Sequence, residues 1–387
     1  MKCVLMNKNT PVIEVFVDDG IIYKISNAYD VRYLPPCVTV NNDIVNKDAL
    51  KDWWKNRSVP ASRDNLRNGL INLGYEEYGS LASPLFLLEK SFGLSLSDQF
   101  WLKPEGSNIE WKDVCYFSNN FSDDVGKALF DNIKTENPDL NSPCNTLEGN
   151  LIKKWTVIDG KRCIVKGGSF YYQEPFNEVV ASEICNSLNI PHIPYTLKII
   201  HNKPFCVCEN FITPETELVT AYSLLKSYGK YDSHNKYKSF IKACEENKIP
   251  AVENFCDEMI VLDYIIGNHD RHFRNFGVIR NVETLEYVGF APIFDTGASL
   301  RYYTPHCEID LYEDLKSVPF KAFHSEQIKL VKNPERFELS KLKHIPEYAK
   351  DVFSTGNILK KQRADVLAKV LKARIAMLDK ALCRGYH

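Results

Sequence analysis

The sequence lacks long apolar runs and a surplus of charge of either sign, and both absences exclude classes of protein. No segment approaches the roughly 18 apolar residues that a membrane-spanning helix needs, and the N-terminal stretch has no apolar core like that of a secretory signal. The chain carries 48 basic and 50 acidic residues, a balance that disfavours bulk attraction to nucleic acid or to an anionic membrane. We therefore expect a soluble, cytoplasmic protein that binds neither directly.

Paired cysteines are also missing, although the chain has twelve cysteines. None stands in a Cys-x-x-Cys pair, and the closest spacing, Cys206-x-Cys208, is that of side chains on one face of a strand. Disulfide frameworks belong to small secreted chains, and a zinc site would need a second close pair or matching histidines. We expect free, mostly buried thiols.

Composition and periodicity divide the chain into three regions. Residues 1–125 open with short β-rich runs and continue with helical stretches. Residues 126–212 contain an Asn-, Pro- and Ser-rich linker, followed by strands and a helix in the order of a small α+β lobe, with an Asp-Gly turn between the first two strands. Residues 213–387 are mainly helical and end in an amphipathic stretch. The pattern predicts an α+β fold with a β-rich N-terminal accessory domain and a mostly helical C-terminal lobe.

The first region contains conspicuous aromatic and basic side chains. We expect the Trp53–Trp54 pair and Trp101 to pack in a core, as large aromatic residues usually do. Arg57, Arg63 and Arg67 could line a basic surface, but solvated charges are the expected account.

The segment GNHDRHFRNFGVIR carries the clearest chemical signal. It follows an apolar helical pattern and precedes a strand, so we expect a loop presented by rigid elements. Four residues separate Asp270 from Asn275, the spacing at which protein kinases place a catalytic aspartate and a metal-binding asparagine. Asp270 would face an incoming hydroxyl, while Asn275 would reach a magnesium ion on the phosphates.

Two further strand ends fit the same chemistry. The apolar run APIFDTG ends in Phe294 and Asp295 before a glycine-containing turn, and Mg²⁺ prefers oxygen donors such as one or two carboxylates plus phosphates. Upstream, Lys166 ends a strand, where a lysine can neutralise phosphates. Glu178, early in the following helix, is its candidate partner.

The loop TLEGNLIKK precedes the strands of the small lobe. Its Gly149, Asn150 and Lys153 could cover phosphates through backbone N–H groups and positive charge, although the loop has neither a GxGxxG nor a Walker pattern. Each feature alone is a weak signal. Their order along the chain favours an ATP- and Mg²⁺-dependent phosphotransferase.

Other chemistries can be drawn from the same residues. The Asp-Thr-Gly turn also suggests an aspartic protease, but that reading requires a second such motif, and the chain has none. His269, Asp270 and His272 could form a metal-dependent phosphohydrolase site of the HD type, which would need further histidines on upstream helices. A zinc site at His269 and His272 has less support. We expect His272 to pack in the loop or touch a phosphate.

The residues around Asp270 resemble the HipA family of bacterial serine/threonine kinases, known as toxin components of toxin–antitoxin modules. GNHDRHFRN is similar to the family pattern Asn-x-Asp-x-His-x-Lys-Asn at Asn268, Asp270, His272 and Asn275. Arg274 stands where the family often has lysine, which keeps the charge. The resemblance implies that these side chains serve ATP binding and catalysis.

The resemblance extends from about residue 145 to the chain end and is loose before that. IVKGG and the following helix resemble the family's ATP-binding lysine and its helix, and APIFD resembles its metal-binding strand. CENF resembles the hinge, which implies that Glu209, Asn210 and Phe211 lie beside the adenine. The loop TLEGNLIKK departs from the family, which often has a phosphorylated serine there; Ser142 and Thr146 are the neighbouring hydroxyls here.

The family implies a bilobal protein-kinase-like fold that uses ATP and Mg²⁺ to phosphorylate a protein Ser or Thr. It also suggests a small DNA-binding antitoxin as a partner. A small-molecule or lipid kinase with the same centre is the main alternative. A catalytically silent toxin–antitoxin binding module is the other, and the intact set of Asp270, Asn275 and Asp295 argues against it.

Overall fold

The computed structural model describes residues 1–42, 44–75, 84–169 and 171–383. They form two compact units. Unit 1 comprises Met1–Val165, Glu209–Val219 and Ile279–Glu286. Unit 2 comprises the described residues of Lys166–Cys208, Thr220–Val278 and Tyr287–His387. The boundaries at residues 125 and 212 remain a prediction.

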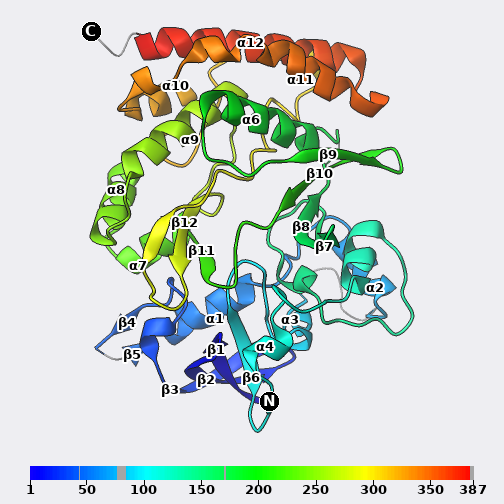
Figure 1. Ribbon diagram of the computed structural model, residues 1–387, viewed down its shortest axis with the longest axis vertical. Coiled ribbons are helices and arrows are strands. Elements are labelled where there is room, and N and C mark those ends of the chain that lie inside the picture. Colours follow the sequence, from blue (N-terminus) through cyan, green and yellow to red (C-terminus); the bar gives the residue numbers. More distant parts are fainter. Residues whose placement is uncertain (43, 76–83, 170, 384–387) are drawn as a thin grey trace. The chain divides into compact units, whose positions relative to one another are not determined.

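Most elements of both units are labelled in Figure 1. The strands in chain order are β1 (Lys2–Asn7), β2 (Thr10–Asp18), β3 (Ile21–Ala28), β4 (Val40–Asn41), β5 (Ile44–Val45), β6 (Phe100–Pro104), β7 (Lys153–Ile158), β8 (Lys161–Lys166), β9 (Thr196–Ile200), β10 (Lys203–Glu209), β11 (Thr216–Thr220), β12 (Gly277–Asn281) and β13 (Tyr287–Phe290). The α-helices in chain order are α1 (Lys47–Asn56), α2 (Leu66–Asn72), α3 (Phe86–Lys90), α4 (Trp111–Val114), α5 (Asp124–Gly126), α6 (Glu174–Leu188), α7 (Ala221–Tyr228), α8 (Lys236–Glu246), α9 (Val252–Ile266), α10 (His324–Gln327), α11 (Ile345–Ser354) and α12 (Lys361–Cys383).

Unit 1 begins with an antiparallel sheet in the order β3-β2-β1-β6. Its strands alternate buried and exposed residues over part of their length, as a sheet with one face on a core does.

The predicted Asp-Gly turn joins β7 to β8, and Asp159 and Gly160 both have positive φ, as a two-residue hairpin turn requires. The β-rich start that the sequence predicts is confirmed.

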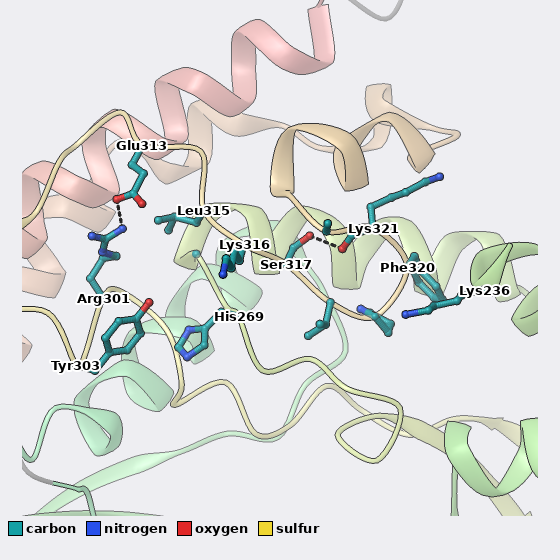
Figure 2. Close-up of a pocket in the computed structure, with 14 residues that line it drawn as sticks. Lys236, His269, Arg301, Tyr303, Glu313, Leu315, Lys316, Ser317, Phe320 and Lys321 are labelled. Atoms are coloured by element: carbon teal, nitrogen blue, oxygen red, sulfur yellow. Dashed lines mark hydrogen bonds and ion pairs between the residues drawn. The ribbon is translucent and has the colours of Figure 1, made fainter. Parts of the chain in front are cut away.

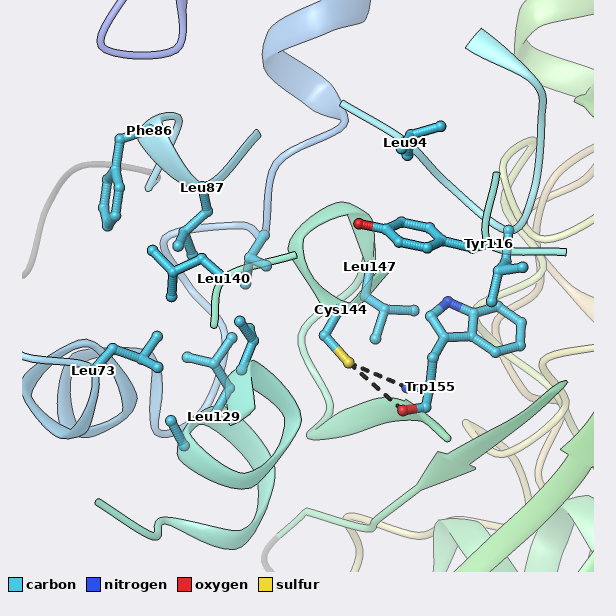
Figure 3. Close-up of a cluster of buried hydrophobic side chains, with 14 of the residues drawn as sticks. Leu73, Phe86, Leu87, Leu94, Tyr116, Leu129, Leu140, Cys144, Leu147 and Trp155 are labelled. Carbon is cyan, nitrogen blue, oxygen red and sulfur yellow. Dashed lines mark hydrogen bonds between the residues drawn. The ribbon is translucent and has the colours of Figure 1, made fainter. Parts of the chain in front are cut away.

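Two apolar clusters form the core of unit 1. One lies between the first sheet and α1 and includes Trp54. The other surrounds Trp101 and Trp155 and is shown in Figure 3, where the thiol of Cys144 lies against the backbone of Trp155. The core positions expected for Trp54 and Trp101 are therefore confirmed, with exposures of 2% and 1%. Trp53 is only partly buried and packs against the edge of the cluster that includes Trp54.

The expectation for the arginines of unit 1 was wrong in two of three cases. Arg67 is exposed, but Arg57 and Arg63 are buried. Arg57 forms an ion pair with Asp98 at 2.7 Å. A buried cation is stable only when hydrogen-bond acceptors compensate its charge. Here the acceptors lie far along the chain, so a local pattern could not show that these arginines are buried.

Unit 2 contains the long helices. α9 carries apolar side chains around most of its circumference and is buried along nearly all its length. It ends at Gly267, which has a φ of +59° and closes the helix in the left-handed conformation expected of a C-terminal glycine. α12 packs against α9 and α11, and α11 packs against α6, as Figure 1 shows. The helical C-terminal part predicted from the sequence is confirmed.

All twelve cysteines are free, and all but Cys307 and Cys383 are buried, as expected. Among the described residues, no helix combines the length and the apolar character needed to cross a membrane.

Candidate active site

Lys166, the last residue of β8, is the centre of a buried polar cluster in unit 2. Its Nζ lies 3.3 Å from Glu178 Oε1, 3.0 Å from Asp295 Oδ1 and 3.2 Å from the Tyr195 hydroxyl. Burial opposes the charge of the ammonium group, but the carboxylates of Asp295 and Glu178 outweigh it and hold the pKa of Lys166 well above its ordinary value. Lys166 is therefore a cation held by two carboxylates that are distant in sequence.

Glu178 also fixes the turn that follows Asp295. Its Oε2 accepts hydrogen bonds from the backbone N–H of Thr296 at 2.8 Å and from the Thr296 hydroxyl at 2.6 Å. Asn177, beside it on α6, donates to the carbonyls of Gly297 and Ser299. A Cβ at Gly297 would lie 3.2 Å from Glu174 Cβ, so glycine permits this close approach of the turn to the helix.

The turn holds Asp295 in an uncommon backbone conformation. Its φ is +58°, a left-handed value that non-glycine residues adopt rarely and usually only where the surroundings enforce it. The contacts of α6 with the next residues supply that enforcement. The carboxylate of Asp295 is about one-third exposed, so it can contact both Lys166 and a bound group.

The loop from Asn268 to Asn275 presents the second half of the site. Asp270 follows α9 closely, and its side chain is half-exposed. Partial removal of water raises the pKa of its carboxyl, the charge of Asp295 adds to the rise, and His272 opposes it. Asn275 is buried and donates through Nδ2 to the carbonyl of Asp270 at 2.8 Å. That bond leaves the Asn275 side-chain oxygen as the atom suited to a cation.

Arg271 joins the two halves and was missed by the sequence analysis. Its guanidinium is fully buried and makes two hydrogen bonds of 3.0 Å to the carboxylate of Asp263 on α9. Its Nη1 donates to the carbonyls of Asn275, at 2.8 Å, and Phe294, at 2.6 Å. One guanidinium thus fixes both the end of the loop and the residue that precedes Asp295.

Further positioning contacts surround this loop. Asn268 donates to Asp263 at 2.9 Å and accepts at its own side-chain oxygen from the Asp270 N–H at 3.0 Å. The Nε2 atom of buried His324 lies 3.0 Å from the Asn268 carbonyl. Asp263, His324 and Tyr195 carry no sequence signal of their own, because their partners lie between five and about a hundred residues away along the chain.

The other predicted residues of unit 2 lie around the same loop. His272 is exposed, and its Nδ1 accepts from the Arg274 N–H at 3.2 Å. The Arg274 guanidinium lies 4.1 Å from the ring centroid of Tyr222. Phe294 contributes its carbonyl to Arg271. The structure therefore gathers Asp270, Asn275, Asp295, Lys166 and Glu178 in one unit, while their roles remain predictions.

The remaining predicted residues belong to unit 1. The carbonyl of Gly149 accepts from Arg63 at 3.0 Å and 2.8 Å, and the Asn150 side chain accepts from Ser62 at 2.7 Å. Lys153 begins β7 and Glu209 ends β10, with Glu209 paired to Lys161 at 2.6 Å. Asn210 bonds the carbonyl of Leu96, and Phe211 follows it. Their predicted contacts with ATP stay predictions.

The donor set of unit 2 fits a magnesium ion with phosphates. Asp295 offers a partly exposed carboxylate and Asn275 an amide oxygen, both hard donors that Mg²⁺ prefers. In the part of the chain that the structure describes, no three His, Cys, Asp or Glu side chains gather as a metal site. The His269 ring stacks on Tyr302, with centroids 5.7 Å apart. The side-chain oxygens of Asp295 and Asn275 would therefore bind the ion together with phosphate oxygens.

Comparison with known proteins agrees with this chemistry. Residues 146–372 match the HipA-like C-terminal domain. Serine/threonine-protein kinase CtkA of Helicobacter pylori strain J99 is 34% identical over 131 residues, which are 32% of this chain and 40% of that relative. The chain thus matches less than half of that relative's length.

Solved structures share the fold at low sequence identity. The crystal structure of the Helicobacter pylori proinflammatory kinase CtkA is similar with a TM-score of 0.50 and 22% identity, covering 60% of this chain and 94% of that one. HipA of Shewanella oneidensis MR-1, solved in a complex with HipB and operator DNA, is similar with a TM-score of 0.54 and 12% identity, covering 98% and 97%. These likenesses show a mixed α+β fold. Because the matching domain covers more than half of its length, the chain belongs to the HipA-like kinase family.

Proposed function

We propose that this chain is an ATP- and Mg²⁺-dependent serine/threonine protein kinase with a bilobal kinase-like fold. The observation that carries the proposal is the buried ammonium of Lys166 between Glu178 and Asp295, next to a loop that presents Asp270 and Asn275. A lysine paired with a helix glutamate, together with an Asp and an Asn for metal, is the set of groups that protein kinases use.

The phosphates of ATP would bind between these groups. Lys166 would exchange its contact with Asp295 for a phosphate oxygen, while Glu178 keeps the ammonium in place. Asp295 and Asn275 would hold Mg²⁺, whose charge offsets that of the phosphates. By resemblance, Gly149, Asn150 and Lys153 would cover the phosphates. Glu209, Asn210 and Phe211 would line the adenine, and His272 and Arg274 would add positive charge near the loop.

Asp270 would orient the acceptor hydroxyl and receive its proton. Its partly exposed carboxylate can reach a substrate, and its raised pKa makes it a better proton acceptor than an ordinary aspartate. The backbone around it is fixed by Asn268 and Asn275. Such fixing matters because phosphoryl transfer depends mainly on positioning and on charge stabilisation.

The name of the relative that matches at 34% identity, a serine/threonine-protein kinase, supports a protein hydroxyl as the acceptor. The likeness to HipA solved with HipB and operator DNA supports a second, smaller proposal. In it, a small DNA-binding protein acts as a partner of this chain, as the antitoxin of a toxin–antitoxin pair.

The test is phosphorylation of protein by the purified chain. Incubation with γ-labelled ATP, Mg²⁺ and a cell lysate should label Ser or Thr residues, identified by mass spectrometry. Asp270→Asn should remove the label, while Asp310→Asn, an exposed aspartate outside the site, should keep it. Label on a metabolite or lipid alone would establish the small-molecule kinase instead. No consumption of ATP by the wild-type chain would leave only the silent binding module.

A further inference from the structure

A cavity of about 620 Å³ lies in unit 2 at the start of the loop that presents Asp270. Gly267 and His269 line it at the start of the loop, and Glu313 and residues 315–322 line another part. Figure 2 shows His269 near Leu315, Lys316 and Ser317. Arg301 and Tyr303 line a further part, and Lys236 lies at its edge. The roles proposed above for Lys166, Asn275 and Asp295 use none of these residues.

The charge of this cavity is predominantly positive. Four of its lining side chains are cations: Lys236, Arg301, Lys316 and Lys321. Glu313 is the carboxylate of the lining, and it is paired with Arg301, as the dashed line in Figure 2 marks. Within the described residues, none of the three lysines forms an ion pair, so three positive charges lack a partner carboxylate. A bound anion would therefore gain attraction without displacing an internal partner.

The floor of the cavity is apolar and is firmly built. Leu315 and Phe320 are buried, and the Phe320 ring packs edge-on against Tyr237 with centroids 5.1 Å apart. The side-chain oxygen of Gln327 accepts from the Phe320 and Lys321 N–H groups at 3.1 Å and 3.3 Å, and the Ser317 hydroxyl donates to the Lys321 carbonyl at 3.0 Å. Lys316 and Lys321 therefore belong to a segment whose backbone is held by internal hydrogen bonds.

The cavity is also adjacent to the proposed chemistry. His269 lines it and is bonded directly to Asp270 in the chain, so the two Cα atoms are about 3.8 Å apart. Tyr302 and Tyr303 pack on the His269 ring at centroid distances of 5.7 Å and 5.1 Å and fix its position. A peptide whose hydroxyl reaches Asp270 would place residues a few positions away in this cavity.

We infer that the cavity binds an acidic segment of the protein substrate, close in sequence to the Ser or Thr that is phosphorylated. The inference rests on the proposed kinase function. Glu or Asp side chains of that segment face Lys236, Lys316 and Lys321, while its apolar atoms lie on Leu315 and Phe320. This apolar floor and the rim carboxylate Glu313 suit a peptide better than the uniformly charged backbone of a nucleic acid.

Binding without catalysis tests the inference directly. The probe is a fluorescent peptide with one central Ala in place of the acceptor and Glu residues on both sides, compared with the same peptide carrying Gln. The full-length wild-type chain should bind the Glu peptide more tightly, and added salt should weaken binding. Lys316→Glu/Lys321→Glu should weaken it about tenfold, because two attractive contacts become repulsive. The control Lys238→Glu/Lys242→Glu makes the same charge change at exposed sites outside the cavity and should bind as wild type.

Kinetics then separate docking from the proposed function. With Ser restored, the Lys316/Lys321 variant should show a KM for the Glu peptide raised about tenfold, with kcat and the KM for ATP nearly unchanged. Equal binding of Glu and Gln peptides, or equal loss in both double variants, would overturn the inference while phosphorylation stands. Tighter binding of an oligonucleotide through the same lysines would also overturn it. Selective peptide binding without any phosphotransfer would uphold the binding site and reject the kinase.

Discussion

Arg63 of unit 1 and the buried cations beside the candidate site in unit 2 have different kinds of partner. In unit 1, Arg63 donates to the carbonyls of Leu147 and Gly149, and burial lowers its pKa to about 10. In unit 2, Lys166 lies between two carboxylates and Arg271 makes a bidentate pair with Asp263, so the pKa of each is raised. Carbonyl partners hold a loop in shape, whereas carboxylate partners also supply charge that a metal or a phosphate can engage.

This difference separates a contact that stabilises a loop from contacts that are proposed to take part in catalysis. Backbone carbonyls are neutral and part of the main chain, so the hydrogen bonds from Arg63 hold the loop that contains Gly149 in one conformation. The carboxylate of Asp295 is partly exposed and can exchange one partner for another. Replacing Arg63 should therefore cost stability and replacing Lys166 should cost turnover, while replacing Arg271, which has both carboxylate and carbonyl partners, should cost both.

Arg271→Met should have the largest effect. It leaves the buried carboxylate of Asp263 without its cation, which costs about 3–5 kcal/mol in the free energy of unfolding. Arg271→Met/Asp263→Leu should recover much of the stability but not activity, because the carbonyls of Asn275 and Phe294 still lack their donor. Urea unfolding and phosphotransfer assays measure both. Arg336→Met, which breaks an ion pair that α9 makes at the surface, should cost under about 1 kcal/mol. A similar loss in the free energy of unfolding for Arg271→Met and Arg336→Met would contradict the positioning role of Arg271.

Asp295→Asn should lower kcat by about 10³-fold or more while the fold survives, because one of the two side chains proposed to bind the metal loses its charge. Circular dichroism checks the fold, and phosphotransfer checks the rate. Asp310→Asn, an exposed aspartate of unit 2, is the matched control. Near-normal turnover in Asp295→Asn would exclude Asp295 as a metal ligand.

Lys166→Ala should reduce kcat/KM for ATP by about 10²- to 10³-fold, because the phosphates lose a preformed positive charge. The control is Lys198→Ala, which removes an exposed lysine from β9. Steady-state kinetics at varied ATP concentration distinguish the two. An unchanged kcat/KM in Lys166→Ala would mean that the cluster is structural, like that of Arg63.

Arg63→Ala tests the other side of the comparison. Its loss leaves the Leu147 and Gly149 carbonyls without their donor and should cost about 1–3 kcal/mol in the free energy of unfolding. Arg67→Ala, an exposed neighbour, should be nearly neutral. Thermal unfolding and proteolysis near residue 149 measure the effect. If Arg63→Ala changed stability no more than Arg67→Ala does, the hydrogen bonds of Arg63 would not stabilise the loop.

His324 offers a third arrangement, a buried base beside a carbonyl with no carboxylate against it. Burial lowers its pKa to about 3, so the unfolded chain binds a proton at this residue between about pH 6.5 and pH 3 when the folded chain does not. Stability should therefore fall with decreasing pH in that window, by up to about 1.4 kcal/mol per pH unit from this group. His324→Asn should flatten the slope of urea midpoints measured between pH 7 and pH 5. An unchanged slope would mean that folding does not change the protonation of His324.

Local patterns predicted several of the helices, strands and turns that surround the candidate site. The apolar stretch before Gly267 forms α9, and the Asp-Gly turn joins β7 to β8, because both signals act within a few residues. The spacing of Asp270 and Asn275 and the strand end at Lys166 were visible for the same reason. The strand predicted to end at Asp295 was wrong, because β13 ends at Phe290 and Ile293 forms only an isolated bridge with His192. Their contacts at 3.0–3.3 Å agree with the expected grouping of Lys166, Glu178 and Asp295, although their roles in catalysis stay predictions.

Local sequence patterns are enough to assign most helices and strands, and the residue types give the oxygen donors and positive charges. Which of these charges are buried, and which groups hold them, depends on how the chain folds in three dimensions. Arg271 and Asp263 on one side, and Arg57 and Arg63 on the other, have no local pattern that distinguishes them from exposed residues such as Arg67. The physical reason is that a buried charge is stable only with partners at hydrogen-bonding distance, and the fold brings these partners from distant parts of the chain.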